Sequence, residues 1–314
     1  MTTTQSIRYN ADGSINLIEL DVPDPAPNEI QLTSGACGIC SWDIATCKMG
    51  DKMSPMAPPG HEGVGYVSKI GAEVTGFKEG DRVTGGGFSL TRNVAVDRVH
   101  RIPDSDLADQ YWIVEPVSCA VTGLDRCNLR PGNKVVLIGS GFMGLLLLQG
   151  LLHSPLDGIV VIDIVQSRLD LAKQMGAAET YNAAEMDSAD LCAMLKAREI
   201  DVVLDSTGSQ PGLDMATDIV KRGGLINIFG WIKGQRASFD PTKWHLGGFS
   251  VVNSAPASQK FPPFPAAIRL IHQGVFDLKP LVTHTSSLND YPALMGQILT
   301  GDADYIKGVV MLDA

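Results

Sequence analysis

Residues 134–148, KVVLIGSGFMGLLLL, place an apolar strand, a glycine-rich turn and an apolar helix in direct succession. Gly139, Gly141 and Gly144 have the spacing G-x-G-x-x-G. In that pattern the first glycine permits a tight turn, the second lets a pyrophosphate approach the backbone, and the third lets helix and strand pack closely. The stretch therefore predicts a dinucleotide-binding turn. An ordinary strand-to-helix turn is the alternative in a chain with 33 glycines.

The segments around this turn continue the same alternation. Continuous apolar strands separated by helical stretches follow as GIVVID, SRLDLAKQMGA, DVVLDS, GLINIFGW and FSVVNSA. Such alternation is typical of a parallel sheet buried on both faces, so we predict an α/β, Rossmann doubly wound domain over residues 118–255. The free N–H groups at the start of the helix would face the phosphates. Phe142 and Met143 at that start, and Thr207 after DVVLDS, join the candidate nucleotide-binding residues.

The strand GIVVID ends at Asp163, 19 residues after Gly144. A carboxylate there accepts hydrogen bonds from the adenosine ribose hydroxyls and repels a 2′-phosphate, which predicts NAD over NADP as the cofactor. Ile164 follows it in the same candidate site. Arg168 supports the opposite choice, because a guanidinium can hold a phosphate. We give Asp163 the greater weight.

The N-terminal and C-terminal parts of the chain have a different pattern of apolar and polar residues. Residues 1–117 contain short apolar and polar stretches separated by PDPAPN, PPG and TGGG, which is typical of a β-rich, partly barrel-like domain. Residues 256–314 contain two helical stretches, the strand-like LVTHTS and the closing strand KGVVML. This tail is too short for a separate domain. We therefore expect residues 1–117 and 256–314 to form one domain.

Composition excludes several classes of partner. The net charge is −10, which leaves no basic surface for nucleic acid or anionic lipid. The most apolar run, 135–152, is interrupted by glycines and is not a membrane span. We see no secretory signal at the N-terminus, so the six cysteines are expected to be reduced thiols in a cytoplasmic protein.

Four residues form a candidate metal constellation. Cys40 lies in ACGICSWD, His61 and Glu62 lie in PPGHEGVGYV, and Glu115 lies in VEPVSCA. Thiolate, imidazole and carboxylate are the ligands of open catalytic zinc sites, where zinc lowers the pKa of an alcohol so that an alkoxide can release hydride to nicotinamide. Each residue also has an ordinary structural interpretation, since a single cysteine or histidine is more often a core residue.

Several motifs together resemble the zinc-containing medium-chain dehydrogenase/reductase family, in its sorbitol dehydrogenase-like branch. They are GICSWD, GHEGVGYV, IGAEVTGFKEGDRV, EPVS, VVLIGSGFMG, RGGLINIFGW and KGVVML, and they occur in order over nearly the whole chain. The resemblance implies a β-rich GroES-like catalytic domain. It also implies that Cys40, His61 and Glu115 hold a catalytic zinc ion and that Glu62 is a neighbouring or exchangeable ligand.

Two departures from this family pattern narrow the expectation. The lobe with four cysteines that binds a structural zinc in many members is missing after GDRV, so we predict one zinc ion per chain and assign Cys37 to the core. The Ser or Thr that receives the alcohol proton in the family is replaced by Trp42, and an extended backbone would turn Ser41 elsewhere. Glu62, Asp43 or a water on the metal are the alternatives. Trp42 itself forms either a pocket wall or part of the core.

By analogy with this branch, the predicted reaction is reversible oxidation of a secondary alcohol, of a polyol, sugar or cyclitol, with NAD. Further candidate pocket residues are Trp231, Trp244 and His245. Three other functions stay open: a dehydrogenase of a larger cyclic biosynthetic intermediate, a zinc-free quinone or enoyl reductase, and a non-catalytic nucleotide-binding protein. The resemblance also implies a homodimer or homotetramer, joined through the strand FSVVNSA.

Overall fold

The computed structural model describes residues 2–50, 59–230, 236–254 and 263–312. The chain divides into two compact units: a β-rich unit of residues 1–116 and 267–314, and a parallel-sheet unit of residues 117–266. The predicted boundary at residue 256 lies outside the described residues. No helix in the described ranges is long and apolar enough to cross a membrane.

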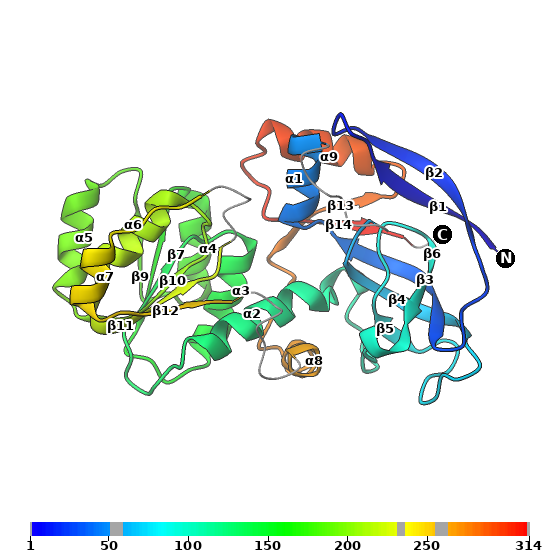
Figure 1. Cartoon of the computed structure of the whole chain (residues 1–314), viewed down its shortest axis with the longest axis horizontal. Coiled ribbons are helices and arrows are strands. Elements are labelled where there is room, and N and C mark those ends of the chain that lie inside the picture. Colours follow the sequence, from blue (N-terminus) through cyan, green and yellow to red (C-terminus); the bar gives the residue numbers. More distant parts are fainter. Residues whose placement is uncertain (1, 51–58, 231–235, 255–262, 313–314) are drawn as a thin grey trace. The chain divides into compact units, whose positions relative to one another are not determined.

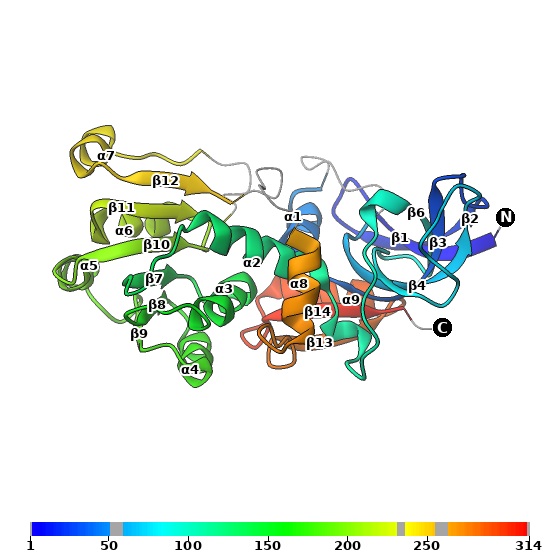
Figure 2. The ribbon, with the colours of Figure 1, turned by 90° about the horizontal axis from the view of Figure 1, so that it is seen from below.

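The parallel-sheet unit contains six strands, which Figure 2 shows side by side. They are β7 (Val135–Ile138), β8 (Ile159–Asp163), β9 (Glu179–Asn182), β10 (Ile200–Asp205), β11 (Val220–Ile228) and β12 (Ser250–Asn253). Their spatial order is β12-β11-β10-β7-β8-β9, and every neighbouring pair is parallel. Because the chain leaves β7 in one direction and later returns to its other side at β10, ligands are expected between these two strand ends. The predicted doubly wound Rossmann fold is confirmed.

Helices connect these strands and cover the sheet. They are α3 (Phe142–Leu152), α4 (Gln166–Met175), α5 (Ser188–Lys196), α6 (Gln210–Ile219) and α7 (Pro241–Gly247). Helix α3 packs beside α4, and α5 packs beside α6. The central strand β7 is apolar throughout because both faces of the sheet are covered, and Val136, Leu137 and Val203 on β7 and β10 are fully buried. Each such side chain contributes about 1.5–3 kcal/mol through burial.

The β-rich unit is built on a second six-stranded sheet (Figure 1). It contains β3 (Glu29–Gly38), β4 (Glu62–Ile70), β5 (Arg82–Thr84), β6 (Thr91–Ala95), β13 (Val282–Ser287) and β14 (Lys307–Met311). The order is β13-β14-β3-β4-β5, with β6 also paired to β3. A separate hairpin, β1 (Thr2–Tyr9) with β2 (Ile15–Val22), lies in the same unit. The predicted β-rich GroES-like domain is confirmed, and the last strand of the chain pairs with β3 inside it.

Helices and short turns complete the chain. They are α1 (Ser41–Met49), α2 (Val114–Arg126), α8 (Pro263–His272), α9 (Tyr291–Thr300) and the 3-10 turns η2 (Val96–Arg98) and η3 (Asp109–Tyr111). The segment after Cys40 is therefore helical, so the extended backbone on which the expected direction of Ser41 depended is not present. The helix starts there because the Asp43 carboxylate accepts the backbone N–H of Cys40, which caps the first turn.

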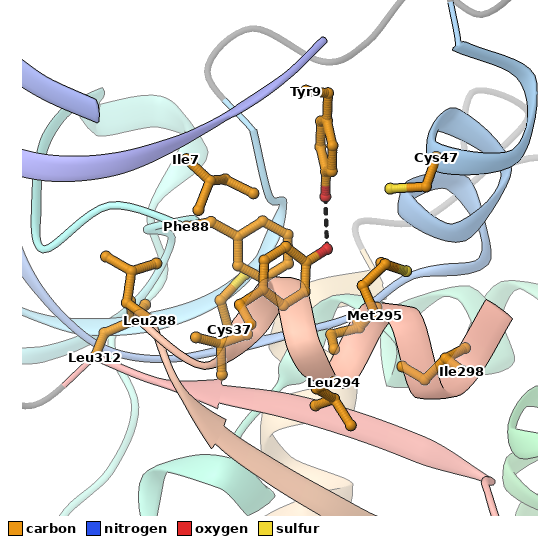
Figure 3. Close-up of a cluster of buried hydrophobic side chains, with 13 residues drawn as sticks. Ile7, Tyr9, Cys37, Cys47, Phe88, Leu288, Leu294, Met295, Ile298 and Leu312 are labelled. Atoms are coloured by element: carbon orange, nitrogen blue, oxygen red, sulfur yellow. Dashed lines mark hydrogen bonds between the residues drawn. The ribbon is translucent and has the colours of Figure 1, made fainter. Parts of the chain in front are cut away.

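The core of the β-rich unit joins the hairpin, α1 and α9 (Figure 3). Ile7 and Tyr9 come from β1, Cys37 comes from β3, and Tyr291 comes from α9. The rings of Phe88 and Tyr291 stack with their centroids 4.8 Å apart. Cys37 is fully buried in this cluster, where we expected it. This packing holds α1, and with it the end of β3, in place.

Candidate functional site

Strand pairing brings three candidate metal ligands together. Strands β3 and β4 are antiparallel, with Gly38 opposite Glu62. Cys40 follows the end of β3 and His61 precedes β4, so both lie just beyond this last pair. Their ligand atoms and that of Glu62 all lie within 4.8 Å of one another. The register of β3 with β4 therefore brings together ligands from two segments that are distant in sequence.

The chemistry of this group fits a divalent cation. Burial and the Glu62 carboxylate raise the pKa of the Cys40 thiol far above its usual value, although Lys307 opposes the shift. Without a cation the thiol stays protonated beside a carboxylate, whereas a coordinated ion removes its proton outright. The buried Nδ1 atom of His61 has no hydrogen-bond partner within the described residues. Thiolate, imidazole and carboxylate are the donors that zinc takes, so the residues present fit zinc.

Asp43 faces the core behind this group. Its carboxylate accepts the Cys40 N–H at 2.8 Å and the Tyr9 hydroxyl at 3.1 Å. The Tyr9 and Tyr291 hydroxyls are hydrogen bonded to each other at 2.7 Å, as the dashed line in Figure 3 shows. Burial raises the pKa of Asp43 to about 6, while the neighbouring His61 lowers it. Asp43 is buried and accepts one of these bonds on each oxygen, so it positions Cys40; its role as acceptor of a substrate proton stays a prediction.

Glu62 has a buried cationic partner. Its carboxylate forms an ion pair with the Lys307 ammonium, and the two side chains are 3% and 4% exposed. Lys307 also donates to the Ile39 carbonyl at 2.8 Å. Burial opposes the charge on Lys307, but Glu62 and Cys40 outweigh it and the pKa of the lysine is raised. Gly38 is required here, because a Cβ at that position would lie 2.1 Å from the Glu62 carboxylate.

A half-buried cation, Arg92, holds the turn before His61. The Arg92 guanidinium on β6 donates to the carbonyls of Gly60 at 3.3 Å and Gly86 at 2.7 Å. Burial lowers the pKa of Arg92. The Phe88 N–H donates to the Pro59 carbonyl at 3.0 Å in the same place. These bonds connect the turn before His61 to residues 84–88, TGGGF. This is the segment where the sequence lacks the structural-zinc lobe that many family members have.

The other candidates of the β-rich unit lie at separate positions. Glu115 is half-buried in the first turn of α2 and is not one of the three residues whose ligand atoms lie within 4.8 Å. Its role as a zinc ligand stays a prediction. Trp42 is half-buried on α1, and its carbonyl accepts the Thr46 hydroxyl at 2.9 Å.

The further aromatic candidates belong to the parallel-sheet unit. The Trp244 ring packs against Phe239 at 4.4 Å between centroids, and its Nε1 donates to the Thr217 hydroxyl. His245 is exposed on α7. Trp231 lies outside the described residues. Trp244 thus has a structural role within its own unit.

The glycine-rich turn has the geometry that its spacing predicts. Gly139 has φ of +93°, and a Cβ at Gly144 would lie 2.0 Å from the Gly139 carbonyl. By contrast, a Cβ at Gly141 would meet only Arg168 Nη1, at 4.0 Å, so the chain leaves this position open. Gly141 begins α3 without a side-chain cap, which leaves N–H groups available to a phosphate. Phe142 is buried and Met143 half-buried in this first turn.

The ends of neighbouring strands bring the other nucleotide candidates to this turn. Thr207 follows β10 and would lie 3.0 Å from a Cβ at Gly139. Asp163 ends β8 and accepts hydrogen bonds from Ser140. Ile164 beside it is 68% exposed, an apolar side chain left open to solvent at the rim of the turn. The predicted nucleotide residues therefore gather at the carboxyl ends of β7, β8 and β10.

Four residues of these sites escaped the sequence analysis: Tyr9, Arg92, Ser140 and Lys307. Arg92 and Lys307 are single cations at or within short strands, a pattern that signals a buried partner but does not identify it. Tyr9 carries no such signal. Ser140 lies inside the predicted glycine-rich turn, but its sequence position does not reveal that its hydroxyl points to the Asp163 carboxylate.

Comparisons with known proteins agree with this geometry. Residues 26–104 match the family model described as alcohol dehydrogenase GroES-like domain, and residues 143–273 match the one described as zinc-binding dehydrogenase. The first match contains Cys40, His61 and Glu62, and the second begins inside the glycine-rich turn.

Individual relatives cover the chain almost from end to end. D-arabinitol dehydrogenase 1 of Uromyces fabae is 27% identical over 91% of each chain. L-threonine 3-dehydrogenase of Deinococcus radiodurans is 27% identical over 95% of this chain and 94% of its own. A crystal structure of a zinc-binding dehydrogenase from Sinorhizobium meliloti, bound to NADP, has a TM-score of 0.86 at 20% identity and covers 99% of this chain and 100% of that one.

Proposed function

Because this chain belongs to the zinc-containing medium-chain dehydrogenase/reductase family and is an alcohol dehydrogenase by its relatives, we propose that it is a zinc-dependent, NAD-linked enzyme that oxidises a secondary alcohol. The observation that carries the proposal is the convergence of Cys40, His61 and Glu62 within 4.8 Å. We assign one zinc ion per chain to this group, with Glu115 as a further ligand. Zinc held there supplies Lewis acidity toward a hydroxyl group.

The residues of the chain divide the remaining work. Cys40 and His61 hold the ion, and Asp43 orients the helix turn that carries Cys40. Lys307 neutralises Glu62, which lets a carboxylate remain buried beside a thiolate. Gly139, Gly141 and Asp163 receive the nucleotide. The proton acceptor is open between Glu62, Asp43 and a water on the metal, and we favour Glu62 and water because Asp43 is buried and already accepts a hydrogen bond on each oxygen.

A polyol, sugar or cyclitol is the substrate class that we favour. Two relatives are named for D-arabinitol and for position 3 of L-threonine, and both compounds carry secondary hydroxyl groups. NAD is favoured over NADP by the Asp163 carboxylate at the end of β8. Because the structurally similar protein from Sinorhizobium meliloti binds NADP, NADP is tested beside NAD in the experiment below.

One experiment tests these assignments together. Zinc is determined on the purified protein, and reduction of NAD and NADP is followed over polyols, cyclitols, sugars, short alcohols and larger cyclic alcohols, with oxidation of NADH and NADPH followed over quinones and enones. We expect one zinc ion per chain, with NAD reduced fastest by a compound that has vicinal hydroxyls. Absent zinc with reduction of quinones or enones would indicate a zinc-free reductase. Turnover of larger cyclic alcohols alone would indicate a dehydrogenase of a cyclic biosynthetic intermediate. Binding of NADH without turnover of any substrate would indicate a non-catalytic nucleotide-binding protein.

Trp42 is proposed as a wall of the substrate pocket. The Trp42→Ala variant is expected to raise KM for the best polyol about tenfold with a smaller change in kcat, because stacking of an aromatic ring on a sugar contributes about 1–1.5 kcal/mol. Trp42→Phe keeps an aromatic ring and serves as the matched control, with KM within about threefold of the original. Steady-state kinetics over the substrate panel measure both. An unchanged KM and an unchanged substrate ranking in Trp42→Ala would show that Trp42 only packs in the core.

A further inference from the structure

Asp163 is surrounded by hydrogen-bond donors of its own chain. One carboxylate oxygen, Oδ1, accepts the backbone N–H groups of Ile164 at 2.7 Å and Val165 at 3.0 Å. The other, Oδ2, accepts the backbone N–H of Ser140 at 2.5 Å and the Ser140 hydroxyl at 2.9 Å. An ionised carboxylate has about four acceptor positions. All four are therefore used within the protein.

Three of these donors belong to the backbone and keep the same place whatever the side chains are. The fourth, the Ser140 hydroxyl, comes from the variable position between the first two glycines of the turn. Ser140 is fully buried, so its hydroxyl has little freedom to turn toward water. A ribose hydroxyl that approaches Asp163 would have to displace this hydroxyl from Oδ2. The displaced group would then lose a hydrogen bond to a charged acceptor, which is among the stronger kinds.

We propose that Ser140 determines cofactor specificity, because its hydroxyl competes with the adenosine ribose for the Asp163 carboxylate. This inference rests on the proposed function, in which Asp163 receives the ribose of NAD. The competition lowers the affinity for NAD. It does not add to the repulsion between the Asp163 carboxylate and the 2′-phosphate of NADP. Ser140 thus makes the preference for NAD over NADP smaller than Asp163 alone would make it.

Arg168 acts in the same direction. Its Nη1 atom lies 4.0 Å from the position of a Cβ on Gly141, next to Ser140 in the chain. Arg168 is also in the first turn of α4, five residues after Asp163, and a guanidinium in this segment can hold a phosphate and offset part of the repulsion by the carboxylate. Together the two residues make this turn more tolerant of NADP than its acidic residue suggests.

The test is a binding measurement on the zinc-loaded protein. Dissociation constants of NADH and NADPH are obtained from nucleotide fluorescence for the original chain and for Ser140→Ala. We expect Ser140→Ala to bind NADH about three- to tenfold more tightly, because one position on Oδ2 becomes free for the ribose. NADPH binding should stay within twofold or weaken, since the carboxylate loses a neutralising donor. The preference for NADH over NADPH therefore rises.

Two further variants make the result specific. Ser140→Cys has nearly the same size and a weak S–H donor, so its NADH affinity should fall between those of serine and alanine. It also provides a second measurement if the alanine variant folds poorly. Ser167→Ala removes an exposed hydroxyl from the first turn of α4, and neither dissociation constant should change.

A double-mutant cycle identifies the partner of Ser140. In the Asp163→Ala background the Ser140→Ala change should leave NADH affinity unaltered, because the contested carboxylate is gone. An unchanged or weaker NADH affinity in Ser140→Ala, or an equal gain for NADPH, would overturn the inference. If the original chain binds neither nucleotide, the proposed function fails first. The two failures are therefore distinguishable.

Discussion

The Cys40→Ala variant is expected to contain no zinc and to lose at least about 10³-fold in kcat/KM. A Lewis acid supplies several kcal/mol to the transition state, and each 1.4 kcal/mol is a factor of ten. Cys40 supplies the thiolate of the assigned ligand set, and without it the ion would depend on imidazole and carboxylate donors alone, which hold zinc more weakly. NADH affinity should stay within about twofold, since the glycine-rich turn belongs to the other compact unit. Metal analysis, NADH titration and steady-state kinetics measure the three effects.

Cys192→Ala is the matched control for this change. Cys192 is a half-buried thiol on α5 in the parallel-sheet unit, whereas Cys40, His61 and Glu62 belong to the β-rich unit. The control should keep one zinc ion per chain and its kcat/KM within about twofold. A stoichiometry of one zinc in Cys40→Ala would place the metal elsewhere and remove the basis of the proposed function. Loss of zinc in both variants would point to a general effect of cysteine removal.

The Lys307→Met variant is expected to lose about 3–5 kcal/mol in the free energy of unfolding, because it leaves the Glu62 carboxylate buried without its cation. Methionine has an unbranched side chain of similar length, so the loss reflects charge more than volume. In the β-rich unit this corresponds to a decrease in Tm on the order of 10 °C. Calorimetry of the protein freed of zinc is suitable, since no bound ion then neutralises Glu62 and the method can resolve the transitions of the two units.

Two companion variants separate charge from packing. Lys307→Met combined with Glu62→Gln removes both charges and should recover most of the lost stability, because a buried pair replaced as a whole is nearly neutral. Lys279→Met changes an exposed lysine of the same unit and should alter stability by less than about 0.5 kcal/mol. If Lys307→Met also lost no more than that control, the ion pair would contribute little. The assignment of Lys307 as the counter-ion of Glu62 would then be wrong.

The extent of prediction from sequence differs between the two units. In the parallel-sheet unit β7 and β8 are built from apolar runs and the turn has a fixed glycine spacing, so local patterns are sufficient to place β7, α3 and β8. In the β-rich unit the short alternating stretches predicted strands, but no helix was predicted at residues 41–49, where α1 lies. Its first turn contains Ser41 and Trp42, which carry little helical signal, and it is stabilised by the Asp43 cap and by packing against α9.

The same division applies to the candidate site. The kinds of ligand were readable from Cys40, His61 and Glu62, because a thiol, an imidazole and a carboxylate have their metal chemistry wherever they lie. Their convergence required the register of β3 with β4. The partners Lys307 and Tyr291 come from the far end of the chain, and no local pattern could pair them with Glu62 or with Tyr9.

By itself the sequence therefore determined the fold class, the nucleotide turn and the residue types of the metal site, since periodicity, glycine spacing and side-chain chemistry are local properties. Only the tertiary structure decided which buried charge faces which, that Asp43 points into the core, and that the Ser140 hydroxyl fills the last acceptor position of Asp163. These are contacts between segments distant in sequence. They depend on strand register and packing, where a shift of one residue turns a side chain to the opposite face.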